Sequence, residues 1–224
     1  MSCVLAAVLD LDDCLVDTAA TTDPYAQWFA RAYGVPVEEV KAADQLHDGR
    51  RHAFFTDLKD RFGIKVPVTE LYAEYRLRVP RLTPYRPEVC QMVRALLDAG
   101  WRLTVLSNGA PDTQWAKLRH SGLHRFFPRH RVVTSGEWGP RKPERELFAI
   151  ALDALDVPTA VMVGDSLHDD IAGAKAAGLY TVFWLALGRQ LRDGDPQPDH
   201  VVQTVTEAGD FLLTATNLVM PIPA

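Results

Sequence analysis

The chain is poor in cysteine. Its 224 residues include only Cys3, Cys14 and Cys90, and no two of these form a CxxC pair. An odd set without that spacing indicates neither a disulfide framework nor a zinc site. We therefore expect the protein to work in a reducing compartment, the cytoplasm.

Long apolar runs and an excess of positive charge are also missing. No apolar stretch approaches the ~20 residues that span a bilayer, so the sequence predicts no membrane segment. The N-terminus has no basic region ahead of its apolar run, which argues against a secretory signal. A net charge of −5 argues against nucleic acid and against an anionic membrane as the main partner.

Short apolar runs that alternate with amphipathic segments dominate what is present. The first run is Val4–Leu9, and it stops at Asp10. Later runs of strand length cover residues 103–106, 132–133, 160–163 and 181–184, and helical patterns cover residues 89–97, 144–155 and 170–177. Such alternation predicts parallel strands joined by right-handed crossovers. The predicted fold class is therefore α/β, a doubly wound parallel sheet.

The segment between the first strand and residue 84 has a different character. Apolar residues recur there at helical spacing over residues 25–32, 37–46, 51–62 and 68–78, and no strand pattern is present. We expect residues 1–17 and 85–224 to form an α/β catalytic core and residues 18–84 to form an all-helical cap. Because the insertion begins just after the first strand, we expect it to act as a lid over the carboxyl edge of the sheet.

The first strand delivers a dense group of acids. Asp10, Asp12 and Asp13 lie within four residues, where their carboxylates repel one another unless positive charge lies among them. The carboxyl edge of an open α/β sheet is the place where such a fold builds its site. The sequence therefore predicts a functional site at this edge.

Other polar groups fall at the ends of the later strands or in the loops that follow. They are Ser107, Lys142, Asp165, Asp169 and Asp170. A carboxylate cluster of this density favours a hard divalent cation such as Mg²⁺. A lysine and a hydroxyl then suit the oxygens of a phosphoryl group. Each motif alone is weak evidence, and their order and spacing together favour phosphoryl transfer.

These residues resemble a known set of motifs. Asp10-Leu11-Asp12, then Leu106-Ser107-Asn108-Gly109, then Arg141-Lys142-Pro143, then Gly164-Asp165 with Asp169-Asp170 are similar to the four motifs of the haloacid dehalogenase-like (HAD) hydrolase superfamily. The resemblance covers essentially the whole chain. It is closest to the phosphatase members, whose helical cap follows the first strand.

The resemblance implies a role for each residue. Asp10 is the nucleophile and a metal ligand, and it forms an aspartyl-phosphate. Asp12 donates a proton to the leaving oxygen and later accepts one from water, while its backbone carbonyl ligates the metal. Ser107, Asn108 and Lys142 bind the phosphoryl group. Asp165 is a further metal ligand, and either Asp169 or Asp170 supports the metal, with Asp170 favoured by the residues that follow it.

One residue departs from the family pattern. Cys14 stands where the family usually has threonine or valine. Its side chain is small and has no catalytic role in that scheme, so we expect activity to survive the change. If the thiol is accessible, the enzyme is expected to be sensitive to oxidation.

The predicted function is a magnesium-dependent phosphatase of small phosphorylated metabolites, such as sugar phosphates, phosphoglycolate or nucleoside monophosphates. One alternative is a 2-haloacid dehalogenase, which needs no magnesium and does not use an acid two residues after the nucleophile. Another is a non-catalytic binding protein that retains the fold. Asp12 and the acidic last motif argue against the first alternative. The complete set of acids, hydroxyl and lysine argues against the second.

Overall fold

The computed structural model describes residues 5–47, 50–185 and 191–215, so that Cys3 and Val4 lie outside the described residues. The chain divides into two compact units. The sheet unit comprises Met1–Val16 and Tyr85–Ala224, and the helical unit comprises Asp17–Pro84. Among the described helices, none is long and apolar enough to cross a membrane.

Within the described residues, the sheet unit contains six parallel strands in the order β3-β2-β1-β4-β5-β6. The strands are β1 (Ala6–Leu9), β2 (Arg102–Ser107), β3 (Val132–Thr134), β4 (Val161–Gly164), β5 (Tyr180–Trp184) and β6 (His200–Val202). This topology confirms the predicted doubly wound α/β fold. The edge strand β6 was not predicted.

The strand order reverses at β1. From β1 the chain proceeds to β2 and β3 on one side, and it then returns to place β4 on the other side. Leu9 in β1 pairs with Val105 in β2 and with Val163 in β4. In open parallel sheets the crevice at such a reversal, at the carboxyl ends of the strands, is where ligands bind. The reversal therefore lies beside Asp10, the residue that follows β1.

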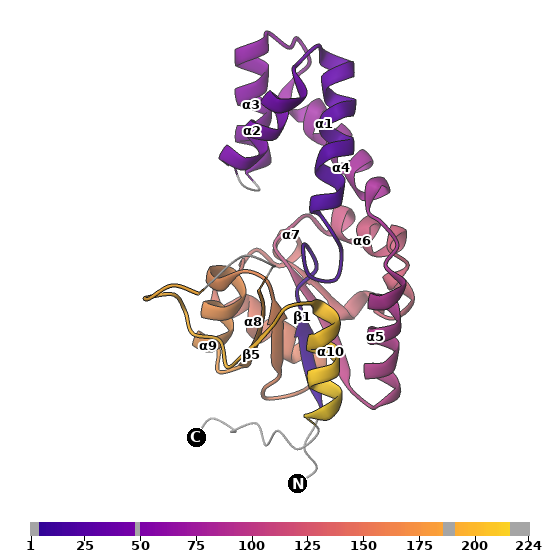
Figure 1. Cartoon of the computed structure of the whole chain (residues 1–224), viewed down its shortest axis with the longest axis vertical. Helices are drawn as coiled ribbons and strands as arrows, with labels where there is room; N and C mark the ends of the chain where they lie inside the picture. The colour runs from indigo at the N-terminus through magenta and orange to yellow at the C-terminus, as the bar shows by residue number, and fades with distance from the viewer. Residues whose placement is uncertain (1–4, 48–49, 186–190, 216–224) are drawn as a thin grey trace. The chain divides into compact units, whose positions relative to one another are not determined.

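Alternate residues of β1 bury their side chains against opposite layers of helices. Ala7 and Leu9 belong to the core that includes α5 (Pro87–Asp98) and α10 (Val205–Thr214), whereas Ala6 and Val8 pack with α8 (Arg145–Leu155). Figure 1 shows β1 between these two layers. Because successive strand residues point to opposite faces, a strand buried on both sides is apolar at every position.

The other elements of the sheet unit are short connections around the strands. They are α6 (Pro111–His120), η1 (Leu123–Arg125), η2 (Arg129–Arg131), α7 (Ser135–Trp138), η3 (Leu167–Ala172) and α9 (Gly173–Ala176). The helix predicted over residues 170–177 is thus a π-helical turn followed by a short α-helix. It begins earlier than expected because the Ser166 side chain accepts a hydrogen bond from the Asp169 N–H and caps the turn.

The helical unit contains α1 (Ala19–Tyr33), α2 (Val37–His47), α3 (Arg51–Phe62) and α4 (Val68–Leu82). Its own core is aromatic, with Phe29, Phe54 and Phe55 buried together. Helix α1 begins before the predicted residue 25, because Asp17 accepts a hydrogen bond from the Ala20 N–H at its first turn. Among the described residues of this unit there is no strand. Its role as a cap stays a prediction.

Candidate active site

Three of the predicted acids come together at the reversal of the sheet. Asp10 follows β1, Asp165 follows β4, and Asp170 lies in η3. Each offers a carboxylate oxygen, and these oxygens all lie within 4.8 Å of one another. The Asp10 N–H donates to the Val163 carbonyl over 2.9 Å, which fixes the end of β1 against β4. We call Asp10, Asp165 and Asp170 the acidic triad.

Lys142 provides positive charge within this triad. Its ammonium forms ion pairs with Asp10 and with Asp170, the latter at 2.6 Å between Nζ and Oδ1. The lysine is 4% exposed and Asp10 is likewise 4% exposed, so water screens the pair poorly. Burial alone would lower the pKa of Lys142, but the Asp10 and Asp170 carboxylates outweigh it and raise that pKa. Lys142 therefore stays charged.

One ammonium does not balance three carboxylates. Burial raises the pKa of Asp10 well above its ordinary value, and Asp170 and Asp165 raise it further against the opposing effect of Lys142. Burial, together with the charges of Asp170 and Asp13, raises the pKa of Asp165 to about 7. An excess of buried negative charge on oxygen ligands is the chemistry that binds a hard divalent cation. The acidic triad therefore fits such a cation.

The structure distinguishes Asp170 from Asp169. Asp170 is fully buried, and its Oδ2 accepts from the Ser166 N–H over 3.0 Å while its Oδ1 faces Lys142. A Cβ atom on Gly164 would collide with the Asp170 carboxylate, so this position needs glycine. The Asp169 carboxylate instead accepts a hydrogen bond from the Asn108 amide and contacts the ring nitrogen Nδ1 of His168. Asp170 is thus the member of the acidic triad.

Asn108 connects two of the predicted motifs. Its Oδ1 accepts from the Lys142 N–H over 2.8 Å, and its Nδ2 donates to the Lys142 carbonyl over 2.9 Å. The same Nδ2 donates to Asp169 over 3.1 Å. These bonds engage both ends of the side-chain amide. The Asn108 side chain therefore fixes the backbone that carries Lys142, and its predicted contact with substrate stays a prediction.

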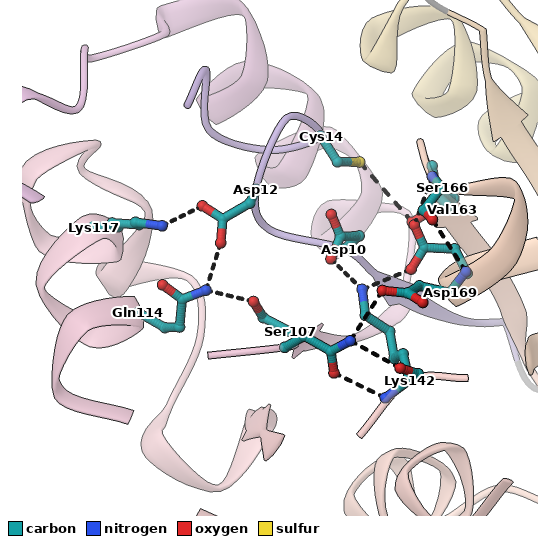
Figure 2. A network of polar contacts seen from close by, with 12 residues as sticks. Asp10, Asp12, Cys14, Ser107, Gln114, Lys117, Lys142, Val163, Ser166 and Asp169 are labelled. Carbon is teal, nitrogen blue, oxygen red and sulfur yellow. Dashed lines mark hydrogen bonds and ion pairs between the residues drawn. The ribbon is translucent and has the colours of Figure 1, made fainter. Parts of the chain in front are cut away.

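Asp12 lies apart from the acidic triad. Figure 2 shows its carboxylate turned toward α6, where Gln114 donates to Oδ2 over 2.6 Å and Lys117 pairs with Oδ1. The Gln114 amide also donates to the Ser107 hydroxyl. Sequence reasoning missed Gln114 and Lys117. The sequence gives weak evidence for a role of these two residues, because they are simply polar residues three positions apart on the buried face of a helix.

Cys14 is inaccessible. Its side chain is fully buried, and its thiol faces the Val163 carbonyl with the sulfur 4.0 Å from the oxygen. Burial and the neighbouring carboxylates, Asp10 first among them, raise the pKa of the thiol well above its ordinary value. Because the thiolate is the reactive species, Cys14 is protected. The condition for sensitivity to oxidation at Cys14 is not met.

Comparison with known proteins identifies the family of this chain. Residues 4–178 match the model of the haloacid dehalogenase-like hydrolases. The chain belongs to this family.

Two curated relatives and one solved structure illustrate the likeness. A phosphoserine phosphatase of Thermus thermophilus is 36% identical over 152 residues, which are 67% of this chain and 59% of that protein. A glyceraldehyde 3-phosphate phosphatase of Methanothermobacter thermautotrophicus is 30% identical over 79% of this chain and 84% of that protein. The HAD hydrolase YfnB of Bacillus subtilis has the same fold, with a TM-score of 0.76 at 21% identity over 93% of this chain and 98% of that one.

The raised pKa of Asp165 predicts how stability depends on pH. Between its ordinary value of 3.8 and about 7, the folded protein holds a proton that the unfolded chain releases. Without a divalent cation, the free energy of unfolding should therefore fall as the pH rises through this window. In chelator, Asp165→Asn should raise the melting temperature at neutral pH by about 3 °C or more and flatten the decline. Thermal melts across the window measure this, and a variant that melts below the wild type at neutral pH would contradict it.

The burial of Cys14 predicts slow alkylation. In the native protein, N-ethylmaleimide should leave Cys14 unmodified over a time in which the urea-unfolded chain reacts completely, because the thiolate is neither formed nor exposed. Peptide mass spectrometry of both samples measures the difference. Equal labelling of Cys14 in the two samples would show that the thiol is accessible.

Proposed function

We propose that this protein is a phosphatase that hydrolyses phosphate monoesters of small molecules, with Asp10 as the nucleophile and Mg²⁺ as the cofactor. The observation that carries the proposal is the acidic triad paired with Lys142 at the reversal of the sheet. A buried carboxylate held between an ammonium and further acids suits attack on a phosphorus atom, whose oxygens need positive charge around them.

The first half of the reaction transfers the phosphoryl group to the protein. An Asp10 oxygen forms a bond to phosphorus while the bond from phosphorus to the leaving oxygen breaks. Asp12, in its protonated form, gives its proton to that oxygen, so that an alcohol leaves. Lys142 and Ser107 hold the oxygens of the transferring group, whose negative charge is spread over three positions.

The second half releases phosphate. Asp12, now ionised, takes a proton from a water molecule whose oxygen attacks phosphorus, and the bond from phosphorus to Asp10 breaks. The acid and the nucleophile then return to their starting states. Asp10, Asp165 and Asp170, with the backbone carbonyl of Asp12, would hold Mg²⁺, which when bound supplies positive charge beside the phosphoryl oxygens.

The relatives support a small, phosphorylated substrate. Those with the names phosphoserine phosphatase and glyceraldehyde 3-phosphate phosphatase point to monoesters of three-carbon compounds. The chain spans 59% of the length of the Thermus protein and 84% of the Methanothermobacter protein. A panel of phosphoserine, glyceraldehyde 3-phosphate, phosphoglycolate, sugar phosphates and nucleoside monophosphates therefore tests the substrate class.

Replacement of the nucleophile gives the primary test. Asp10→Asn should lower kcat for p-nitrophenyl phosphate in Mg²⁺ by about 1,000-fold or more, because the amide cannot form the phosphorylated intermediate. The variant should melt no lower than the wild type in chelator, since it removes one of three repelling charges. A variant that retains most of the activity would overturn the assignment of Asp10.

Removal of the metal separates the proposal from its alternatives. EDTA should abolish wild-type turnover of p-nitrophenyl phosphate, whereas turnover of a 2-haloacid that survives EDTA would instead favour dehalogenase chemistry. A lack of turnover on every phosphate ester, with Mg²⁺ present, would favour a non-catalytic protein.

The two neighbouring acids of η3 provide a matched pair of variants. Asp170→Asn should weaken the apparent affinity for Mg²⁺ by about 10-fold or more, because the acidic triad loses a charge. Asp169→Asn should retain most of that affinity, because Asp169 bonds to Asn108 and His168 instead. Activity titrated against Mg²⁺ concentration measures both. The reverse order of effects would exchange the two assignments.

A further inference from the structure

Helix α6 presents two polar side chains to the interior of the sheet unit. Gln114 is 2% exposed and Lys117 is 7% exposed. Residues three apart lie on one face of a helix, so both reach the same neighbourhood. That neighbourhood is the carboxylate of Asp12, the proposed proton donor. Neither residue belongs to the four motifs.

The two side chains hold both oxygens of that carboxylate. Gln114 donates to Oδ2 over 2.6 Å, and Lys117 pairs with Oδ1. With both oxygens engaged from one helix, the carboxyl group has a fixed orientation. Figure 2 shows the Asp12 carboxylate turned toward α6 and away from Lys142. The ammonium of Lys142 pairs with Asp10 instead. Each of these two acids thus has its own lysine.

Gln114 also sets the direction of the Ser107 hydroxyl. Its amide nitrogen carries two hydrogens, and it bonds to Asp12 Oδ2 and to Ser107 Oγ. Because Oγ accepts this bond, the hydroxyl hydrogen points elsewhere and remains a donor. A donor at this position suits a phosphoryl oxygen. The amide therefore aligns the proton donor and the phosphoryl-binding hydroxyl together.

The lack of a side chain at Gly109 leaves space for the Gln114 amide. A Cβ atom on Gly109 would lie 2.8 Å from Nε2 of Gln114 and 2.9 Å from its Cδ. These distances are too short for real contacts, so a side chain at position 109 would displace the amide. The Gly109 carbonyl accepts from the Gly136 N–H over 3.0 Å, which ties this stretch of backbone to α7.

Packing alone does not account for the lysine. A buried ion pair is often no more stabilising than apolar residues of similar volume, because both charges must leave water. A leucine or methionine at position 117 would fill the same space. The pair is therefore better explained by what it does to Asp12 than by stability.

We propose that Gln114 and Lys117 are positioning residues for Asp12: Gln114 orients the carboxyl group toward the leaving oxygen, and Lys117 holds the carboxylate that remains once the proton has been given. The inference rests on the proposed function, and it adds residues that act through Asp12 and Ser107 rather than on substrate directly. Proton donation matters most when the leaving group is a poor one. An alkoxide needs the proton as it departs, whereas a dinitrophenolate leaves without it.

The test compares two leaving groups in matched variants. The substrates are glycerol phosphate, an alkyl ester, and 2,4-dinitrophenyl phosphate, both with Mg²⁺. Gln114→Ala and Lys117→Met should each lower kcat/KM for the alkyl ester by about 100-fold, the typical contribution of a positioned acid, and lower kcat/KM for the dinitrophenyl ester by less than about 5-fold. The ratio kcat/KM is compared because it covers phosphoryl transfer to Asp10 and not the later attack of water, which is common to both esters. Arg119→Met removes an exposed cation from the same helix and should leave the ratio of the two rates unchanged.

Gly109→Ala is a second and independent variant. It keeps every polar side chain but pushes the Gln114 amide aside, so it should shift the ratio in the same direction as Gln114→Ala. A purely structural defect would lower both rates by the same factor. Equal losses on the two esters, or wild-type ratios in Gln114→Ala and Lys117→Met, would overturn the inference. A wild type that hydrolyses neither ester would instead overturn the proposed function.

Discussion

The site depends on a single buried ammonium among three carboxylates. Lys142 reaches Asp10 and Asp170, and Asp165 completes a group whose oxygens lie within 4.8 Å of one another. One positive charge cannot balance three negative ones where water is scarce. Burial first, and then the repulsion from the neighbouring carboxylates, raise the pKa values of Asp10 and Asp165. The fold holds these charges together at the reversal of the sheet, and a bound divalent cation would relieve the repulsion.

The acids are divided between two separate networks. Asp10 forms an ion pair with Lys142, whereas Asp12 accepts a hydrogen bond from Gln114 and forms an ion pair with Lys117, both on α6. The ion pair with Lys117 holds Asp12 as a carboxylate, which is the form that takes a proton from water in the second half of the proposed reaction. Asn108 then fixes the Lys142 backbone to the end of β2, so that the loop carrying the lysine is positioned by the sheet. Each polar group is thus held by a neighbour on a rigid element.

Much of this could be predicted from the sequence. The strands β1, β2, β4 and β5 are apolar runs because both faces of the sheet are covered. Three of them end at or beside a polar residue of the site: β1 at Asp10, β2 at Ser107 and β4 at Asp165. Asp10, Asp165 and Lys142 follow from that rule and from the family motifs. The residues that follow Asp170 favoured it over Asp169 but left both open, because the burial of Asp170 depends on a π-helical turn that local sequence does not show.

The residues missed by sequence reasoning act through contacts distant in the chain. Gln114 and Lys117 look like ordinary polar residues of a helix, and only the packing of α6 brings them to Asp12. Gly109 belongs to one of the family motifs, but its close approach to the Gln114 amide is visible only in the structure. The edge strand β6 was also missed, and its place depends on pairing with β5. Long-range contacts of this kind are invisible to local periodicity.

The central claim is that the acidic triad holds excess negative charge that a divalent cation neutralises. Titration calorimetry of Mg²⁺ into chelator-treated wild-type protein, at about pH 7 in buffers of different ionisation enthalpy, tests it most directly. The account predicts binding with a heat that depends on the buffer, because Asp165, with a pKa of about 7, releases its proton as the cation binds. Absence of binding, or a heat that is the same in every buffer, would contradict it.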